Sequence, residues 1–159
     1  MKNIAIATLI SLIVLTGGCS KEKTVSNDST KVTAYLFTNK YMSPTHDVEV
    51  TVPLRATAVD SALILVYYYD VSVGGWYSSP GPGAGASYQT RYFMSSTADS
   101  TTFTLRAYSP TFGAYNGGNI TIPKLKIIIA VASDLYSGKK EPVDYNDYKA
   151  TMRYYHLPE

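Results

Sequence analysis

Apolar and polar residues alternate along most of this chain, and this period of two constrains its fold more than any other feature. The clearest run is Asp47–Val52, in which three valines share one face and the polar side chains share the other. Successive side chains of a β-strand point to opposite faces, so this run predicts a strand with one buried face. Residues 87–94 and 102–108 alternate in the same way, and the turn-forming residues between them predict a hairpin.

Two other runs are apolar on both faces and predict central strands. They cover residues 61–70 and 125–132, and strands in the middle of a covered sheet are buried on both sides. Three consecutive tyrosines in the first run favour a strand over a buried helix. Pro53 and Pro123 are expected at strand ends, because proline has no backbone N–H to donate to a neighbouring strand.

The period changes near the C-terminus, where an aromatic stripe recurs at helical spacing. The stripe consists of Tyr145, Tyr148, Met152 and Tyr155. This spacing predicts an amphipathic helix, with Asp144 or Asn146 as its N-cap. A helix of about ten residues is marginal alone in water, so we expect it to pack its stripe on a sheet.

A chain of 159 residues suits one folded domain. The predicted fold class is mainly β: a single antiparallel β-sandwich-like domain over residues 32–159, with one short C-terminal helix. The segments 78–87 and 109–119 are rich in glycine and proline, and both are predicted to be loops.

The N-terminus carries the pattern of a secretory signal. Lys2 precedes an apolar run over residues 4–15, and small residues then lead to Cys19. We therefore predict a signal peptide over residues 1–18. The apolar run of about twelve residues is shorter than the roughly 20 needed to span a bilayer. The polar residues 19–31 are predicted to be a flexible tether that begins at Cys19.

The residues around Cys19 and the end of the chain resemble known proteins. The stretch LTGGCS is similar to the lipobox of bacterial lipoproteins, and CSKEK is similar to the start of many Bacteroidetes lipoproteins. The segments KLKIIIAVAS and PVDYNDYKATMRYYHL resemble the ends of a set of small uncharacterised Bacteroidetes lipoproteins. The resemblance implies that the Cys19 thiol carries palmitate-type acyl chains, which hold the protein on a membrane of the cell envelope. It favours the outer membrane and cell-surface exposure, and it supplies no catalytic or binding residue.

Composition argues against several classes of function. The net charge of +2 gives no basic field for nucleic acid, so no nucleic-acid partner is expected. One cysteine and two histidines do not suit a metal centre, and no metal or cofactor is predicted. His46 and His156 are interpreted as surface residues, and no G-x-S-x-G motif accompanies them. No catalytic residue is therefore predicted.

The aromatic residues are the best candidates for contact with a ligand. Trp76 and Tyr77 adjoin the first glycine- and proline-rich segment, and Phe112 and Tyr115 lie in the second. Aromatic side chains offer flat apolar surfaces to sugars or partner proteins and lose little entropy on binding. The alternative is that these four rings fold back onto the sandwich as lids.

Three serines follow aspartate and precede threonine or alanine, at Ser29, Ser61 and Ser100. These positions resemble the O-glycosylation sites of exported Bacteroidetes proteins. Together the patterns predict a membrane-anchored lipoprotein of the cell envelope that is a non-catalytic surface module. It would bind glycan or an envelope protein through loop aromatics, or help to build the envelope. The alternative left open is a small secreted hydrolase tethered to the envelope.

Overall fold

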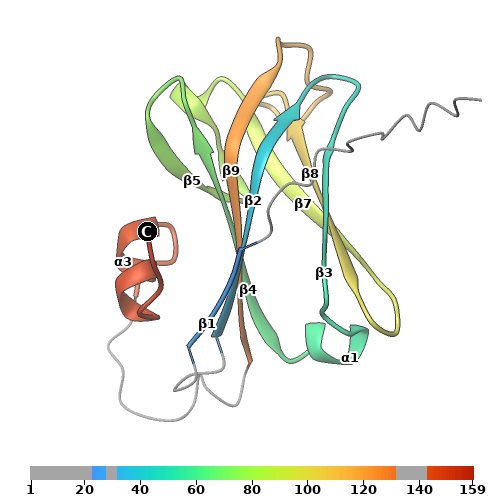
Figure 1. Cartoon of the computed structure of the whole chain (residues 1–159). Helices are drawn as coiled ribbons and strands as arrows, with labels where there is room; N and C mark the ends of the chain where they lie inside the picture. Colours follow the sequence, from blue (N-terminus) through green and yellow to red (C-terminus); the bar gives the residue numbers. More distant parts are fainter. Residues whose placement is uncertain (1–22, 28–31, 132–142) are drawn as a thin grey trace, which may run out of the picture.

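The computed structural model describes residues 23–27, 32–131 and 143–159. The predicted signal peptide, Cys19 and Ser29 lie outside the described residues. Within the described part, the chain forms two antiparallel sheets that pack face to face, and a C-terminal helix lies against one of them (Figure 1). The prediction of a mainly β, sandwich-like domain with one short C-terminal helix is confirmed.

The first sheet has five strands in the order β1-β2-β9-β4-β5. Their bounds are β1 Lys23–Asn27, β2 Val32–Met42, β9 Ile120–Val131, β4 Ala62–Asp70 and β5 Gly75–Ser79. The second sheet has four strands in the order β3-β8-β7-β6. Their bounds are β3 Val48–Val52, β8 Thr101–Tyr108, β7 Gln89–Ser96 and β6 Gly81–Pro82. Two short helical turns complete the sandwich, α1 Ala56–Val59 and η1 Ala84–Ala86.

The main core fills the space between the sheets. Along β3, every second residue is buried, and Val48, Val50 and Val52 are at most 5% exposed. These valines pack with Phe103 and Leu105 of β8, which pairs with β3 and follows the same alternation. Because each strand turns one apolar face inward, the two sheets bury a continuous core, as the period of two predicts.

The two doubly apolar runs are central strands, as predicted. β9 lies between β2 and β4, and β4 lies between β9 and β5. Their inner faces contribute to the main core, and their outer faces contribute to a second core beneath the helix. Residues such as Ile127 and Ile128 are therefore both fully buried although they point to opposite faces.

Pro123 corrects one expectation, since it lies inside β9 rather than at a strand end. Pairing with β4 stops at Lys124, and the ladder with β2 omits Asn39, the residue opposite Pro123. Asn39 has a φ of 56°, which takes its backbone out of regular strand geometry. The strand accommodates Pro123 because its missing N–H falls where the ladders are interrupted. Pro53, by contrast, directly follows β3, as expected.

The C-terminal helix is α3, Tyr148–Tyr154, and it covers the outer face of the first sheet (Figure 1). Tyr148, Met152 and Tyr155 are buried there against β2, β4 and β9. The N-cap is Asp147, whose side chain accepts a hydrogen bond from the Ala150 N–H at 3.0 Å. The expectation of Asp144 or Asn146 as N-cap is therefore wrong. The Asp144 carboxylate instead accepts from the Asn146 N–H at 2.9 Å and shapes the preceding turn.

Two segments predicted to be irregular contain strands. Lys23–Asn27, inside the predicted tether, forms β1 and pairs with β2. In the segment 78–87, Ser79 pairs with β4 and Gly81 pairs with β7. Backbone pairing needs no anchoring side chain, so composition alone did not reveal these strands. The segment 109–119 holds no helix or strand and is a loop, as predicted.

Candidate functional site

Trp76 and Tyr77 lie in β5, so the expectation that they occupy a loop is wrong. Neighbouring residues of a strand point to opposite faces, and these two rings diverge accordingly. Trp76 stacks on Tyr148 of α3, with ring centroids 4.2 Å apart. Tyr77 packs on the main core, and its ring stacks on Tyr68 at 5.9 Å. The two residues therefore do not form one contact surface.

Phe112 and Tyr115 lie in the loop 109–119, but only Phe112 presents its ring to solvent. Phe112 is 52% exposed and has a φ of 63°. Tyr115 is partly buried against the main core, and its hydroxyl donates to the Gly118 carbonyl oxygen at 2.8 Å. Of the four predicted contact residues, Phe112 alone is exposed.

The two described candidate glycosylation serines lie in turns. Ser61 is exposed just before β4, and its hydroxyl donates to the Ala58 carbonyl oxygen at 3.4 Å. Ser100 lies in the turn of the β7–β8 hairpin, and its hydroxyl is 3.0 Å from that of Thr97. Both hydroxyls are near the surface, and their modification stays a prediction.

The outer face of the second sheet is covered by no helix or strand that the structure describes (Figure 1). The period of two turns the valines of β3, Phe103 and Leu105 of β8 and Tyr92 of β7 toward the core. It therefore turns the charged and aromatic residues between them outward. We call this surface, together with the adjoining loop residue, the arginine face. It consists of Asp47, Glu49, Arg91, Phe93, Arg106, Tyr108 and Phe112.

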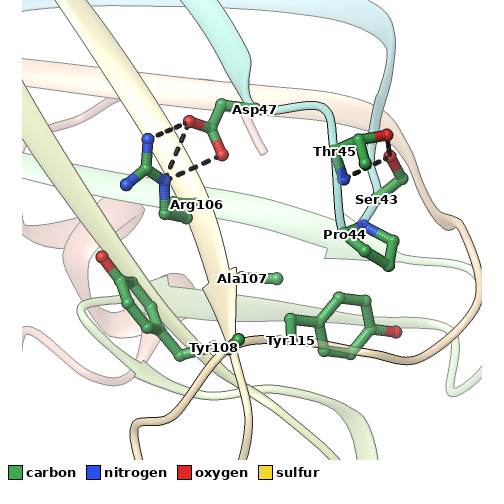
Figure 2. A pocket seen from close by; sticks show the side chains of 9 residues that line it. Ser43, Pro44, Thr45, Asp47, Arg106, Ala107, Tyr108 and Tyr115 are labelled. Atoms are coloured by element: carbon green, nitrogen blue, oxygen red, sulfur yellow. Dashed lines mark hydrogen bonds and ion pairs between the residues drawn. The ribbon is translucent and has the colours of Figure 1, made fainter.

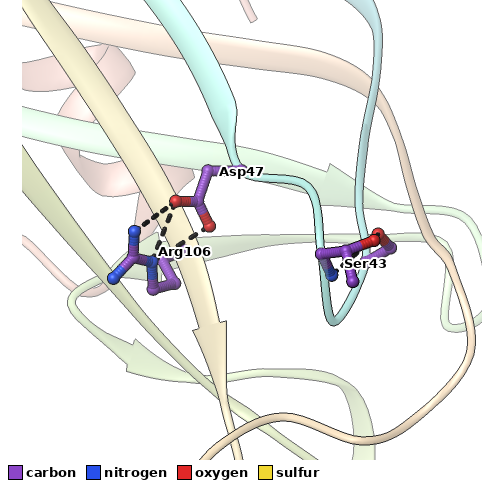
Figure 3. Close-up of polar contacts among 4 residues, drawn as sticks. Ser43, Asp47 and Arg106 are labelled. Carbon is purple, nitrogen blue, oxygen red and sulfur yellow. Dashed lines mark hydrogen bonds and ion pairs between the residues drawn. The ribbon is translucent and has the colours of Figure 1, made fainter.

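An ion pair forms one side of the arginine face (Figure 3). Arg106 Nε and Nη2 donate to Oδ2 of Asp47 at 2.9 and 2.5 Å, and Nε also lies 3.1 Å from Oδ1. The hydrogen bonds and the charge of Asp47 raise the pKa of Arg106, which stays charged. Because the arginine side chain is 49% exposed, the pair contributes little to stability and mainly fixes the position of the guanidinium.

Aromatic rings flank both arginines of this face. The Arg91 guanidinium carbon lies 4.4 Å from the centre of the Phe112 ring and 5.8 Å from that of Tyr108. The Arg106 guanidinium carbon lies 5.6 Å from the centre of the Phe93 ring. Such contacts orient the guanidinium planes. The donor edge of Arg106 is engaged by Asp47, whereas Arg91 is exposed and has no carboxylate partner among the described residues.

A shallow hollow of about 410 Å³, which we call the end pocket, adjoins the arginine face (Figure 2). It is lined by Ser43, Pro44, Thr45, Asp47, Arg106, Ala107, Tyr108, Ala114 and Tyr115. Figure 2 shows the Asp47–Arg106 pair on one side and the 43–45 turn on the other, with Tyr115 below. The pocket thus combines hydroxyl groups, an ion pair and aromatic rings.

A second hollow, of about 420 Å³, lies beside the end pocket and shares Thr45 and Asp47 with it. His46 lines this hollow and is exposed, as predicted, with its ring stacked on Tyr41 at 4.4 Å. Among the described residues, no hydrogen bond links the His46 side chain to a serine hydroxyl or a carboxylate. Within these ranges, His46 is therefore not part of a hydrogen-bonded Ser–His or His–carboxylate pair.

His156 follows α3 and is exposed, as predicted. Over the ranges 23–27, 32–131 and 143–159, no group of three His, Cys, Asp or Glu side chains is placed to hold a metal ion. No helix in these same ranges has the length and apolar character needed to cross a bilayer.

Sequence reasoning missed a buried lysine beneath α3. Lys126 of β9 is 5% exposed, and its Nζ donates to the Tyr148 hydroxyl at 2.5 Å and to the Pro158 carbonyl oxygen at 2.7 Å. Nζ also lies 5.4 Å from the centre of the Trp76 ring. Burial, reinforced by the neighbouring Lys124, lowers the pKa of Lys126 to about 8. The sequence feature that could have revealed this lysine is its position inside the otherwise apolar run 125–132.

Asp70, at the end of β4, is a second buried charged group that sequence reasoning did not single out. Its carboxylate accepts a hydrogen bond from the Tyr88 hydroxyl at 2.7 Å and two from Ser72. Burial raises the pKa of Asp70, but these hydrogen bonds outweigh burial and hold it below its ordinary value. With its partners satisfied in this way, Asp70 links β4 to the residue before β7 and has a structural role.

The strongest candidate site is thus the arginine face with the end pocket, which share Asp47, Arg106 and Tyr108. This surface can stack flat apolar groups and form hydrogen bonds with polar ones. Comparison of this chain with protein-family models, curated proteins and solved structures found no match.

Proposed function

We propose that the protein is a non-catalytic binding module of the cell envelope, lipid-anchored through Cys19, whose arginine face and end pocket bind a glycan. One observation carries the proposal: the uncovered face of the second sheet groups exposed aromatic rings, guanidinium groups and a hollow with hydroxyl groups. Surfaces of this kind on a soluble domain commonly mark a contact site.

The chemistry of this surface fits a sugar better than it fits an apolar ligand. A sugar ring has apolar C–H faces and a rim of hydroxyl groups. The 52% exposed ring of Phe112 can accept an apolar face, while Asp47 and Arg106 can accept and donate hydrogen bonds to hydroxyls. The shallow end pocket is about 410 Å³, which is room for a small saccharide unit.

The lipid anchor is supported by the lipobox-like sequence at Cys19. Stable anchoring takes two or more acyl chains, as a lipidated N-terminal cysteine provides. Replacing Cys19 with Ser should move the protein from the membrane fraction to the soluble fraction of its native host. Equal membrane retention of the variant and the wild type would contradict the anchor.

Binding is tested with the full-length protein, purified in mild detergent, on an array of neutral and acidic oligosaccharides. Phe112→Ala should weaken binding by about tenfold, since an aromatic contact contributes roughly 0.5–1.5 kcal/mol beyond its buried area. Met94→Ala is the matched control, because Met94 is 43% exposed but belongs to the inward-pointing set of β7. The proposal fails if the wild type retains no glycan or if Phe112→Ala binds as well as Met94→Ala.

A further inference from the structure

Two guanidinium groups oppose each other across neighbouring strands of the arginine face. Arg91 of β7 is the direct partner of Arg106 of β8 in the antiparallel ladder. Directly opposed side chains in such a ladder lie about 5 Å apart at Cβ, and like charges there destabilise the sheet. The pair therefore needs negative charge nearby.

Within the described ranges, only one of these two arginines contacts a carboxylate. Arg106 has the bidentate contact with Asp47, and in the described part of the chain no carboxylate contacts Arg91. The neighbours that Arg91 does have are the rings of Phe112 and Tyr108. These rings orient the guanidinium, but they do not neutralise it, and they leave its N–H edge free.

The carboxylates of this face lie on one side of it, so the electrostatic potential differs between its two sides. Asp47 precedes β3 and Glu49 belongs to it, and β3 borders β8 on the side away from β7. An anion would be repelled near β3 and attracted near β7, where Arg91 lies. The guanidinium fork matches the geometry of carboxylate, sulfate and phosphate oxygens, which it binds through two parallel hydrogen bonds.

We infer that the glycan bound at this surface is acidic, with a carboxylate or sulfate group that Arg91 binds while Phe112 stacks on the sugar ring. The inference rests on the proposed function and specifies its ligand class. Arg91 and Phe112 act together because they are in contact, with 4.4 Å between the guanidinium carbon and the ring centre. Because Arg91 lies over one face of the exposed Phe112 ring, the sugar would stack on the other face and direct its anionic group past the ring edge to the guanidinium.

The test compares acidic glycans with neutral glycans of the same backbone, using the full-length protein in detergent. Oligogalacturonate is paired with its methyl ester, and dextran sulfate is paired with dextran. We expect at least tenfold tighter binding of one acidic member than of its neutral partner, and the pair that shows the difference identifies carboxylate or sulfate. Because the contact is ionic, this preference should shrink as salt is raised from 50 to 500 mM.

Arg91→Gln should abolish the preference, so that the acidic and neutral members bind this variant with equal affinity. Arg91→Lys, which keeps the charge but loses the fork, should retain only part of the preference. Arg153→Gln is the matched control, because Arg153 is exposed on α3 and lies on the opposite side of the sandwich. Circular dichroism of each variant checks that the fold is intact.

The outcomes separate the inference from the proposed function. Equal binding of acidic and neutral members by the wild type, or an undiminished preference in a folded Arg91→Gln variant, would refute the inference and leave glycan binding standing. No binding of any glycan on the array by the wild type would refute both.

Discussion

Replacing the buried Lys126 with Met should stabilise the domain at neutral pH and make its stability nearly independent of pH between 7 and 9. Lys126 Nζ is held by the Tyr148 hydroxyl and the Pro158 carbonyl oxygen beneath α3. The charged groups that act on it are Lys124, which lowers its pKa, and Glu159, which raises it. Within the described residues it forms no salt bridge, so the ammonium bears most of the cost of burial.

The size of the effect follows from the two pKa values of this lysine. The ordinary pKa is 10.5, and burial lowers it to about 8 in the folded protein. Below pH 8 both states carry the proton, so the full cost of burying the charge, about 3 kcal/mol, is present. Between pH 8 and 10.5 the unfolded state binds more protons than the folded state, and stability rises with pH. From pH 7 to pH 9 the rise should be about 1 kcal/mol.

The measurement should stop at pH 9 because buried tyrosines act in the opposite direction at higher pH. Burial raises the pKa of Tyr68 to about 12 and also raises that of Tyr148 and Tyr155. Near pH 10 the unfolded state loses these protons first, so stability then falls as pH rises. Below pH 9 their contribution is small, and Lys126 dominates the slope.

The assay is urea unfolding at pH 7, 8 and 9 of a chain that begins at Ser20 and so keeps every residue the structure describes. Lys126→Met removes the cost of about 3 kcal/mol and loses two hydrogen bonds to oxygen of about 1 kcal/mol each, for a net gain of roughly 1 kcal/mol at pH 7. Lys149→Met is the control, because Lys149 is exposed on α3. A wild-type protein without a slope, or a Lys126→Met variant that keeps the slope, would refute the reasoning.

Two further substitutions test how the helix and the η1 turn are held. Tyr67→Phe removes a hydroxyl that donates to the Tyr145 carbonyl oxygen and bonds to the Thr151 hydroxyl. In urea unfolding, this variant should lower the free energy of unfolding by about 1–2 kcal/mol. An unchanged urea midpoint would show that these bonds do not secure α3. Gly83→Ala would place a Cβ 2.1 Å from the Tyr88 ring and should cost at least about 2 kcal/mol, whereas Gly118→Ala meets no atom within 4 Å and should change stability by less than about 0.5 kcal/mol. Equal melting temperatures for the two glycine variants would contradict this account.

Most of the fold could be predicted from the periodicity of strands and helices in the sequence. The buried face of β3, the central positions of β4 and β9 and the buried stripe of α3 all depend on residue spacing, and spacing can be read from the sequence. β1, β5 and β6 were missed wholly or in part, because the strands they pair with, and not their own side chains, determine where they begin and end.

The candidate site was only partly accessible to sequence reasoning. Phe112 was identified because it lies in a loop, and its exposure agrees with that position. Trp76 was misplaced because its glycine-rich surroundings suggested a loop, whereas β5 pairs with β4. Arg91 and Arg106 lie opposite each other because of the register between β7 and β8. The alternation within each strand does not specify this register, which is set when the strands pair.

The position of β1 limits how far the domain can stand from its anchor. β1 begins at Lys23, so residues 20–22 alone separate Cys19 from the first sheet. Even fully extended, four peptide steps reach only about 14 Å, roughly half the thickness of the hydrocarbon layer. If Cys19 is lipidated, the sandwich therefore lies close to the lipid headgroups. A ligand of the domain must then lie close to the bilayer surface.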